Sequence, residues 1–187
     1  MREYTFDALY NKLGYVTQKA VLFAGTVEDN VFFGQSAAEK TDASLQAALS
    51  LSQAAEFVDK YPEKAAHPIA QLGRNVSGGQ KQRLSIARAL ARTPEILIFD
   101  DSFSALDYKT DAVLREGLAK ELPGTTKIIV AQRISTIRNA DQILVLDRGE
   151  IAGLGTHDAL MASCTVYREI AMSQLSEEEL KKGGASK

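Results

Sequence analysis

The sequence predicts an α/β fold built around a parallel β-sheet. Short apolar runs typical of strands, at Leu13–Thr17, Ile96–Phe99 and Lys127–Ala131, alternate with longer segments of helical pattern. A further run at Ile143–Leu146 continues the alternation. Strands that alternate with helices are typical of parallel sheets whose faces are covered by helices. Because the last three runs show no alternation of polar and apolar residues, we expect those strands to be buried on both faces.

Length and composition indicate one globular domain. With 187 residues, of which 45% are hydrophobic, the chain can bury one sizeable core. A net charge of −2 gives no indication of a nucleic-acid-binding surface. Cys164 is the single cysteine, which excludes an internal disulfide and fits a reducing compartment. No signal peptide is recognisable, and no apolar run approaches the roughly 18–20 residues of a membrane span, so we expect membrane association only through a partner or another part of the protein.

The first half of the chain carries helix signals. Thr26 is a plausible N-cap, because Glu28 and Asp29 follow in the first turn and favour the helix dipole. Residues Ser36–Tyr61 then show apolar positions at helical spacing. The pattern predicts two amphipathic helices that are broken near Ser52.

The centre of the chain begins with Ser77-Gly78-Gly79-Gln80, which opens an Ala-rich helix. The unpaired N–H groups and partial positive charge of a helix N-terminus suit an anion such as a phosphate, and glycines let the backbone approach a ligand closely. In the alternative interpretation, Ser77 and Gln80 form an S-x-x-Q capping box and nothing more. Capping alone does not explain the two glycines, each of which costs roughly 1 kcal/mol against Ala inside a helix.

Two carboxylates follow the next predicted strand. The run Ile96–Phe99 ends at Asp100 and Asp101. Ligands of open α/β sheets bind beyond the carboxyl ends of the strands. Asp100 is therefore placed where a carboxylate can hold Mg²⁺ on a nucleotide, and the alternative is that the two aspartates only cap a loop.

These residues resemble a known family. SGGQKQRLSIARAL followed by ILIFDDSFSALD is similar to the signature motif, Walker B motif and D-loop of the ATPase domain of ABC transporters. The resemblance extends over residues 2–173, with further matches at Gln18 and Ala131–Asp158. It implies a P-loop-type parallel sheet core with an inserted helical subdomain, and ATP held between two such domains. Each ATP site would use the Walker motifs of one domain and the SGGQ motif of the other.

The resemblance also implies roles for individual positions. Gln18 alone would be a solvated loop residue, but the following LFAGTVEDNVFFG matches the exporter-type phrase after the Q-loop. Gln18 and Asp100 are the implied Mg²⁺-binding positions, and Asp101 and Gln132 are the implied catalytic positions. The positions implied to contact ATP are Gln18, Ser77, Gly78, Gly79, Gln80 and Asp107.

Three features depart from the family pattern. No glycine begins a G-x-x-x-x-G-K-[ST] P-loop, so we expect the 187 residues to begin after the P-loop strand and helix. The general base, usually Glu, is Asp101, which is shorter by one methylene. The switch histidine is replaced by Gln132, which can donate a hydrogen bond but carries no positive charge. Together, Asp101 and Gln132 resemble the degenerate-site subunit of a heterodimeric ABC exporter, and the signature motif is intact apart from Val76 in place of the usual Leu.

The leading hypothesis is therefore the ATP-binding portion of one subunit of a heterodimeric ABC exporter. It would bind ATP and Mg²⁺ with a second ABC ATP-binding domain, and it would couple to transmembrane domains at the cytoplasmic face of the cell membrane. Two alternatives remain: an ordinary homodimeric ABC ATPase in which Asp101 and Gln132 still work, and a non-catalytic fragment that docks on a partner. We expect a partial ATP-binding domain over residues 1–175, a helical subdomain at about 36–92, and a flexible polar tail at 176–187.

Overall fold

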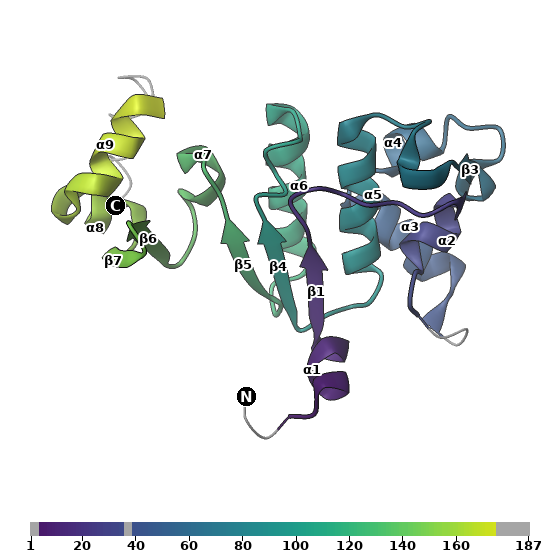
Figure 1. Cartoon of the computed structure of the whole chain (residues 1–187), viewed down its shortest axis with the longest axis horizontal. Coiled ribbons are helices and arrows are strands. Elements are labelled where there is room, and N and C mark those ends of the chain that lie inside the picture. The colour runs from purple at the N-terminus through teal and green to yellow at the C-terminus, as the bar shows by residue number, and fades with distance from the viewer. Residues whose placement is uncertain (1–3, 36–38, 175–187) are drawn as a thin grey trace. The chain divides into compact units, whose positions relative to one another are not determined.

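The computed structural model describes residues 4–35 and 39–174, which form two compact units (Figure 1). The units divide between Val130 and Ala131. We call residues 4–130 the N-terminal unit and residues 131–174 the C-terminal unit, and each is described by itself.

The N-terminal unit contains a three-stranded parallel sheet. Its strands are β1 (Leu13–Val16), β4 (Ile96–Asp100) and β5 (Thr126–Val130), in the order β1-β4-β5. Leu13 pairs with Ile96, which in turn pairs with Thr126, and the register continues without a bulge. The predicted α/β fold with a parallel sheet is confirmed. The three strand ends that carry Gln18, Asp101 and Ala131 point the same way, since parallel strands share their carboxyl edge.

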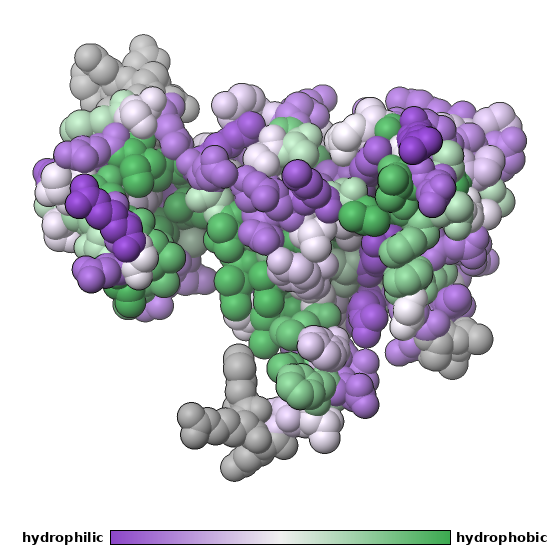
Figure 2. Space-filling view, in the orientation of Figure 1, coloured by the Kyte–Doolittle hydropathy of each residue, from purple (hydrophilic) through white to green (hydrophobic). Residues whose placement is uncertain are grey.

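Only one face of this sheet is buried. Val16, Leu97 and Phe99 are fully buried and belong to one apolar cluster with helices α5 (Gly78–Leu90) and α6 (Tyr108–Glu121). On the opposite face, Ile128 and Val130 of β5 are 50% and 53% exposed, and Figure 2 shows an apolar area over β4 and β5. The prediction that β4 and β5 are buried on both faces is therefore wrong. The physical reason is that α5 and α6 pack on one face, and alternate side chains of a strand point to opposite faces.

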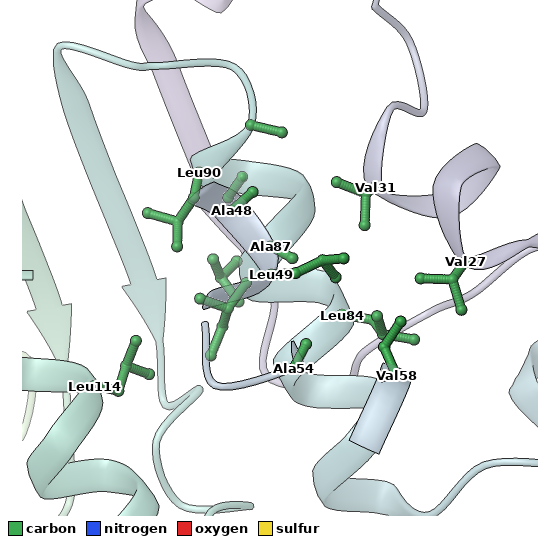
Figure 3. Packing of buried hydrophobic residues seen from close by; sticks show 14 of the residues in the cluster. Val27, Val31, Ala48, Leu49, Ala54, Val58, Leu84, Ala87, Leu90 and Leu114 are labelled. Carbon is green, nitrogen blue, oxygen red and sulfur yellow. The ribbon is translucent and has the colours of Figure 1, made fainter. Parts of the chain in front are cut away.

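Helix α5 lies at the centre of the N-terminal core. Figure 3 shows Leu84, Ala87 and Leu90 of α5 among apolar side chains of the neighbouring helices. These neighbours are α2 (Val27–Val31), α3 (Asp42–Leu51) and α4 (Ala55–Val58). The predicted cap at Thr26 is confirmed, and so is the break near Ser52, where α3 ends. The start of the predicted helical segment, at residues 36–38, lies outside the described residues.

Several short elements of the N-terminal unit were not predicted from the sequence. Helix α1 (Phe6–Lys12) precedes β1 and buries none of its residues. Strands β2 (Gly25–Thr26) and β3 (Pro68–Ile69) form a small antiparallel pair. Single 3₁₀ turns lie at Lys64–Ala66 and Gln71–Gly73.

The C-terminal unit is an antiparallel hairpin with three helices. Strands β6 (Ile143–Asp147) and β7 (Glu150–Gly155) pair through a turn at Arg148 and Gly149, both of which have positive φ. Helices α7 (Ile134–Ile137), α8 (His157–Ser163) and α9 (Thr165–Gln174) complete the unit, which has its own apolar cluster. Strand β6 exists as predicted, but it alternates between buried and exposed residues, so its expected burial on both faces is wrong. The apolar cluster of this unit contains Ile143 and Val145 together with residues of α8 and α9, so these helices cover one face of the hairpin, whereas Leu144 and Leu146 on the other face are exposed.

No helix in the described ranges is both long enough and apolar enough to cross a membrane. The predicted tail at 176–187 lies outside the described residues. The proposed bounds of the helical subdomain stay a prediction.

The contact between β1 and α5 is testable at Gly14. A Cβ at Gly14 would lie 2.8 Å from Leu97 Cδ2, 2.8 Å from Pro94 Cγ and 3.1 Å from the backbone oxygen of Ala89. We expect Gly14→Ala to lower the free energy of unfolding by roughly 1–3 kcal/mol, because overpacking forces neighbouring groups apart. Urea unfolding followed by far-UV circular dichroism measures the change.

Gly124→Ala is the matched control, since a Cβ at Gly124 would meet no atom within 4 Å. Equal unfolding midpoints for the two variants would show that β1 and α5 do not pack as tightly as the structure has them.

Candidate functional site

The start of α5 is closed by a capping box. Ser77 is the N-cap, and its Oγ accepts a hydrogen bond from the N–H of Gln80 at 3.3 Å. In return, the N–H of Ser77 donates to Gln80 Oε1 at 2.8 Å. The predicted S-x-x-Q capping box is therefore present, which satisfies two of the backbone donors at this helix end.

The two glycines of the motif are not explained by the packing of this chain. A Cβ at Gly78 would meet no atom of the described residues within 4 Å, and one at Gly79 would lie 3.6 Å from the backbone oxygen of Ala105, an ordinary contact. Neither glycine has the positive φ that excludes other residues. The absence of internal crowding is consistent with glycines that serve the approach of an external group, which stays a prediction for Ser77 through Gln80.

The carboxylates predicted at the end of β4 lie in different surroundings. Asp100 ends the strand, and its Oδ2 accepts a hydrogen bond from the hydroxyl of Tyr15 at 2.9 Å. This bond raises the pKa of Tyr15 above its ordinary value, since it stabilises the protonated phenol next to a negative charge. Asp101 is 9% exposed and turns the chain with φ of 45°, in the left-handed region that Asp tolerates better than most residues.

Asp101 is tied to both neighbouring strands. Its Oδ2 accepts from Gln18 Nε2 at 3.1 Å, which brings together two residues that lie 83 positions apart. Its backbone N–H donates to the carbonyl of Val130 at 3.0 Å. The Ser104 hydroxyl donates to its carbonyl at 2.7 Å. The implied catalytic aspartate is thus held by its side chain, its N–H and its carbonyl.

Asp107 serves as the N-cap of α6. Its Oδ1 accepts from the N–H of Thr110 at 2.9 Å, and its Oδ2 accepts from the Thr110 hydroxyl at 2.7 Å. The bond from the Thr110 N–H, and after it the bond from the Thr110 hydroxyl, lower the pKa of Asp107 below its usual value. The structure gives Asp107 this capping role, and the predicted contact with a nucleotide is a separate proposal.

Two buried polar residues that sequence reasoning missed hold the end of β1, just before Gln18. The hydroxyl of Ser102 is fully buried and donates to the Val16 carbonyl at 2.9 Å. Gln82 of α5 is 1% exposed, and its Nε2 donates to the Thr17 carbonyl at 3.2 Å. Gln82 had a signal in the sequence, since it lies at helical spacing from Ile86 on the apolar face of α5.

A third group that was missed anchors the segment after Gln18. The guanidinium of Arg88 donates to the carbonyls of Asn30 and Val21, at 2.7 and 3.0 Å. It also lies 5.5 Å from the ring centroids of both Phe23 and Phe33, which stack on each other at 4.3 Å. Burial lowers the pKa of Arg88. The exporter-type phrase therefore forms one cation–π cluster that fixes the chain beyond Gln18.

Gln132 belongs to the C-terminal unit and is described within it. The residue is exposed. It directly precedes Arg133, the N-cap of the short helix α7. Its carbonyl accepts a hydrogen bond from Gln174 Nε2 at 2.7 Å.

The donor set of the N-terminal unit fits part of a Mg²⁺ shell. Asp100 and Gln18 offer the carboxylate and amide oxygens that this hard cation prefers. Among the described residues no group of three or more His, Cys, Asp or Glu side chains could hold a metal by itself. In proteins, Mg²⁺ is usually held by one or two carboxylates together with substrate phosphates and water.

Comparison with known proteins gives concordant matches. Residues 1–104 match a family model described as ABC transporter. A putative ABC transporter ATP-binding protein of Mycoplasma pneumoniae is 42% identical over 176 residues, which are 90% of this chain and 28% of that protein. Multidrug resistance protein 1 of Entamoeba histolytica is 40% identical over 181 residues, which are 96% of this chain and 14% of that protein.

The fold is also similar to a solved structure. A bacterial Atm1-family ABC exporter with ATP bound matches 95% of this chain and 31% of its own, with a TM-score of 0.88 and 35% sequence identity. The chain thus spans less than a third of the length of each of these proteins.

The capping role of Ser77 can be tested by removing or replacing its side-chain acceptor. Ser77→Ala removes the side-chain acceptor of the Gln80 N–H, and we expect this loss of an N-cap to cost about 1 kcal/mol of stability. Ser77→Asp keeps an acceptor, as Asp107 does at α6, and should retain wild-type stability. Hydrogen exchange of the first-turn amides of α5, combined with urea unfolding, measures both effects. If Ser77→Ala proves as stable as Ser77→Asp, the hydroxyl does not cap the helix.

Proposed function

The chain belongs to the ABC transporter family, and from that premise we propose that it is the ATP-binding portion of one subunit of a heterodimeric ABC exporter. In this proposal the chain works mainly as the complement to a competent partner. Its signature motif completes the ATP site of a second ABC ATP-binding domain, and its own site hydrolyses weakly. The observation that carries the proposal is the asymmetry between an intact SGGQ motif and altered residues at positions 101 and 132.

The start of α5 supports the complementing role. Ser77 and Gln80 fix the first turn through the capping box, so the helix end is preorganised before any ligand arrives. None of the described residues crowds Gly78, so a phosphate on the partner could approach the backbone there. Helix N-termini favour anions through their N–H groups and dipole, which is the chemistry that a nucleotide phosphate requires.

The altered positions support a weak site of its own. Asp101 is one methylene shorter than Glu, and a misplacement of about 1 Å can cost on the order of 10²-fold in rate. The Asp101 carboxylate also accepts a hydrogen bond from Gln18, and the backbone N–H of Asp101 is bonded to β5. Both bonds restrict how far the carboxylate can move. Gln132 can orient a phosphate or a water by hydrogen bonding but supplies no positive charge. Together, the two changes would misplace the general base and remove a positive charge that stabilises the transferred phosphate.

Gln18 and Asp100 would hold Mg²⁺ together with phosphate oxygens and water. When bound, the cation neutralises phosphate charge during phosphoryl transfer. Tyr15 keeps one oxygen of Asp100 hydrogen-bonded, and Ser102 and Gln82 fix the strand end that carries Gln18. These contacts hold the proposed ligands on rigid elements of the sheet.

We further propose that transmembrane domains bring the chain to the cytoplasmic face of a membrane. The basis is the exporter and multidrug-resistance relatives, together with the short share of their length that this chain covers. A non-catalytic role is the second candidate, and the absence of the G-x-x-x-x-G-K-[ST] motif from the 187 residues favours it for the isolated chain.

The isolated 187-residue chain should bind MgATP weakly at best and show no measurable hydrolysis. The reason is that a P-loop supplies most of the phosphate cradle, and the sequence contains no such motif. Isothermal titration calorimetry with MgATP and a phosphate-release assay test this. Sub-micromolar binding would show that the functional unit needs no P-loop.

A second test compares two sites in a heterodimer whose full-length subunit contains this sequence. Ser77→Arg places a bulky side chain where the phosphate must approach, so the competent site could not close and most ATP turnover should be lost. Asp101→Asn removes a base that is already shortened, and most turnover should remain.

Steady-state ATPase rates of the two variants provide the comparison, and Asn at position 101 also tolerates the left-handed backbone there. The degenerate-site proposal is wrong if Asp101→Asn removes activity as completely as Ser77→Arg.

A further inference from the structure

The side chain of Gln174 pairs with the backbone of the segment that carries Gln132. Its Nε2 donates to the Gln132 carbonyl at 2.7 Å, and its Oε1 accepts from the N–H of Ile134 at 2.9 Å. One amide thus bonds the chain on both sides of Arg133, as a neighbouring strand would. The assignment of nitrogen and oxygen is fixed by the partners, since the reversed amide would face a donor with a donor and an acceptor with an acceptor.

The packing of α9 places Gln174 at this position. Tyr167 and Ala171 of α9 are 1% and 0% exposed and belong to the apolar cluster of the C-terminal unit, which also contains Ile134. Gln174 follows Ala171 by three residues and Tyr167 by seven, so it continues the same face of the helix. The apolar contacts fix the helix, and the amide extends that face to the backbone of residues 132–134.

Helix α7 depends on this external partner. Its N-cap is Arg133, which makes no side-chain hydrogen bond to the helix start. The N–H of Ile134 is in the first turn, where a helix offers no acceptor of its own. Gln174 supplies that acceptor from another helix, so the start of α7 and the carbonyl of Gln132 are held by a single side chain.

We propose that Gln174 is a positioning residue for Gln132. With the carbonyl of residue 132 and the N–H of residue 134 both held, the backbone that sets the direction of the Gln132 side chain is fixed by α9. The inference rests on the proposed function only in taking residue 132 as the switch position. The contact itself does not depend on ATP, so it can be tested without nucleotide.

Three variants of the chain separate positioning from general packing. Gln174→Met keeps the length and apolar stem of the side chain and removes both hydrogen bonds. Gln174→Glu keeps an acceptor for the Ile134 N–H at neutral pH and loses the donor to Gln132. Ser173→Ala is the control, because within the described residues the Ser173 hydroxyl donates to the Ile170 carbonyl of its own helix.

Residue-resolved hydrogen exchange at low protein concentration gives the readout. We expect the Ile134 amide to exchange about five- to tenfold faster in Gln174→Met, the size expected for one lost hydrogen bond. Gln174→Glu should keep part of the protection at Ile134, because one carboxylate oxygen can still accept from the Ile134 N–H while the other repels the Gln132 carbonyl. A loss of packing alone would not give this partial rescue. The amides of β6 and β7 should be unchanged in all three variants.

Two outcomes would overturn the proposal. Unchanged exchange at Ile134 in Gln174→Met would show that the side chain does not hold the segment. Faster exchange throughout β6, β7 and α8 would show that residue 174 acts through the stability of the whole unit. Neither outcome bears on the ATPase comparison between Ser77 and Asp101, which tests the proposed function separately.

Discussion

The geometry of the candidate site depends on how the carboxyl end of β1 is held. Backbone carbonyls that leave a strand need new hydrogen-bond partners, because an unpaired buried polar group costs free energy. Here Ser102 binds the Val16 carbonyl and Gln82 binds the Thr17 carbonyl. Ser102 comes from the turn after β4 and Gln82 from α5, so one short backbone stretch joins the strand that carries Asp100 to the helix that begins with the SGGQ motif. Gln18 is positioned by these two bonds before its own side chain meets Asp101.

The hydrogen bonds at Ser77 and at Asp101 are independent of each other, so the SGGQ motif and the residue at position 101 can vary separately. The capping box of Ser77 and Gln80 uses atoms of α5 alone, so it persists whatever residue stands at position 101. The turn at Asp101, in contrast, is built from bonds to Gln18, β5 and Ser104. A shorter carboxylate at that position changes the reach of one side chain and leaves the bonds of its backbone in place.

Local sequence patterns predicted most of the helices and strands, whereas features that depend on contacts between distant residues could not be predicted. The helix starts at Thr26 and Ser77 follow from short-range capping chemistry, which is encoded within four residues. The apolar run of β5 correctly predicted a strand, but whether Ile128 is covered depends on which helices reach that face, and no local pattern contains that information. The roles of Ser102 and Gln174 were invisible for the same reason, since each bonds to residues tens of positions away. Gln82 could have been noticed in the sequence as a polar residue on an apolar helix face, but its partner, the Thr17 carbonyl, is identified only by the structure.

The hydrogen bond from the N–H of Asp101 to the Val130 carbonyl has a mechanical consequence. Val130 is the last residue of β5, and its carbonyl belongs to the peptide group that leads into Ala131, where the N-terminal unit ends. Any change in the orientation of this peptide group would alter the hydrogen bond to the N–H of Asp101. Asp101 already occupies the left-handed region, where few neighbouring conformations are open to a residue with a side chain. The last peptide group of β5 is therefore also part of the turn that holds Asp101, so the backbone conformation at Asp101 depends on where β5 ends.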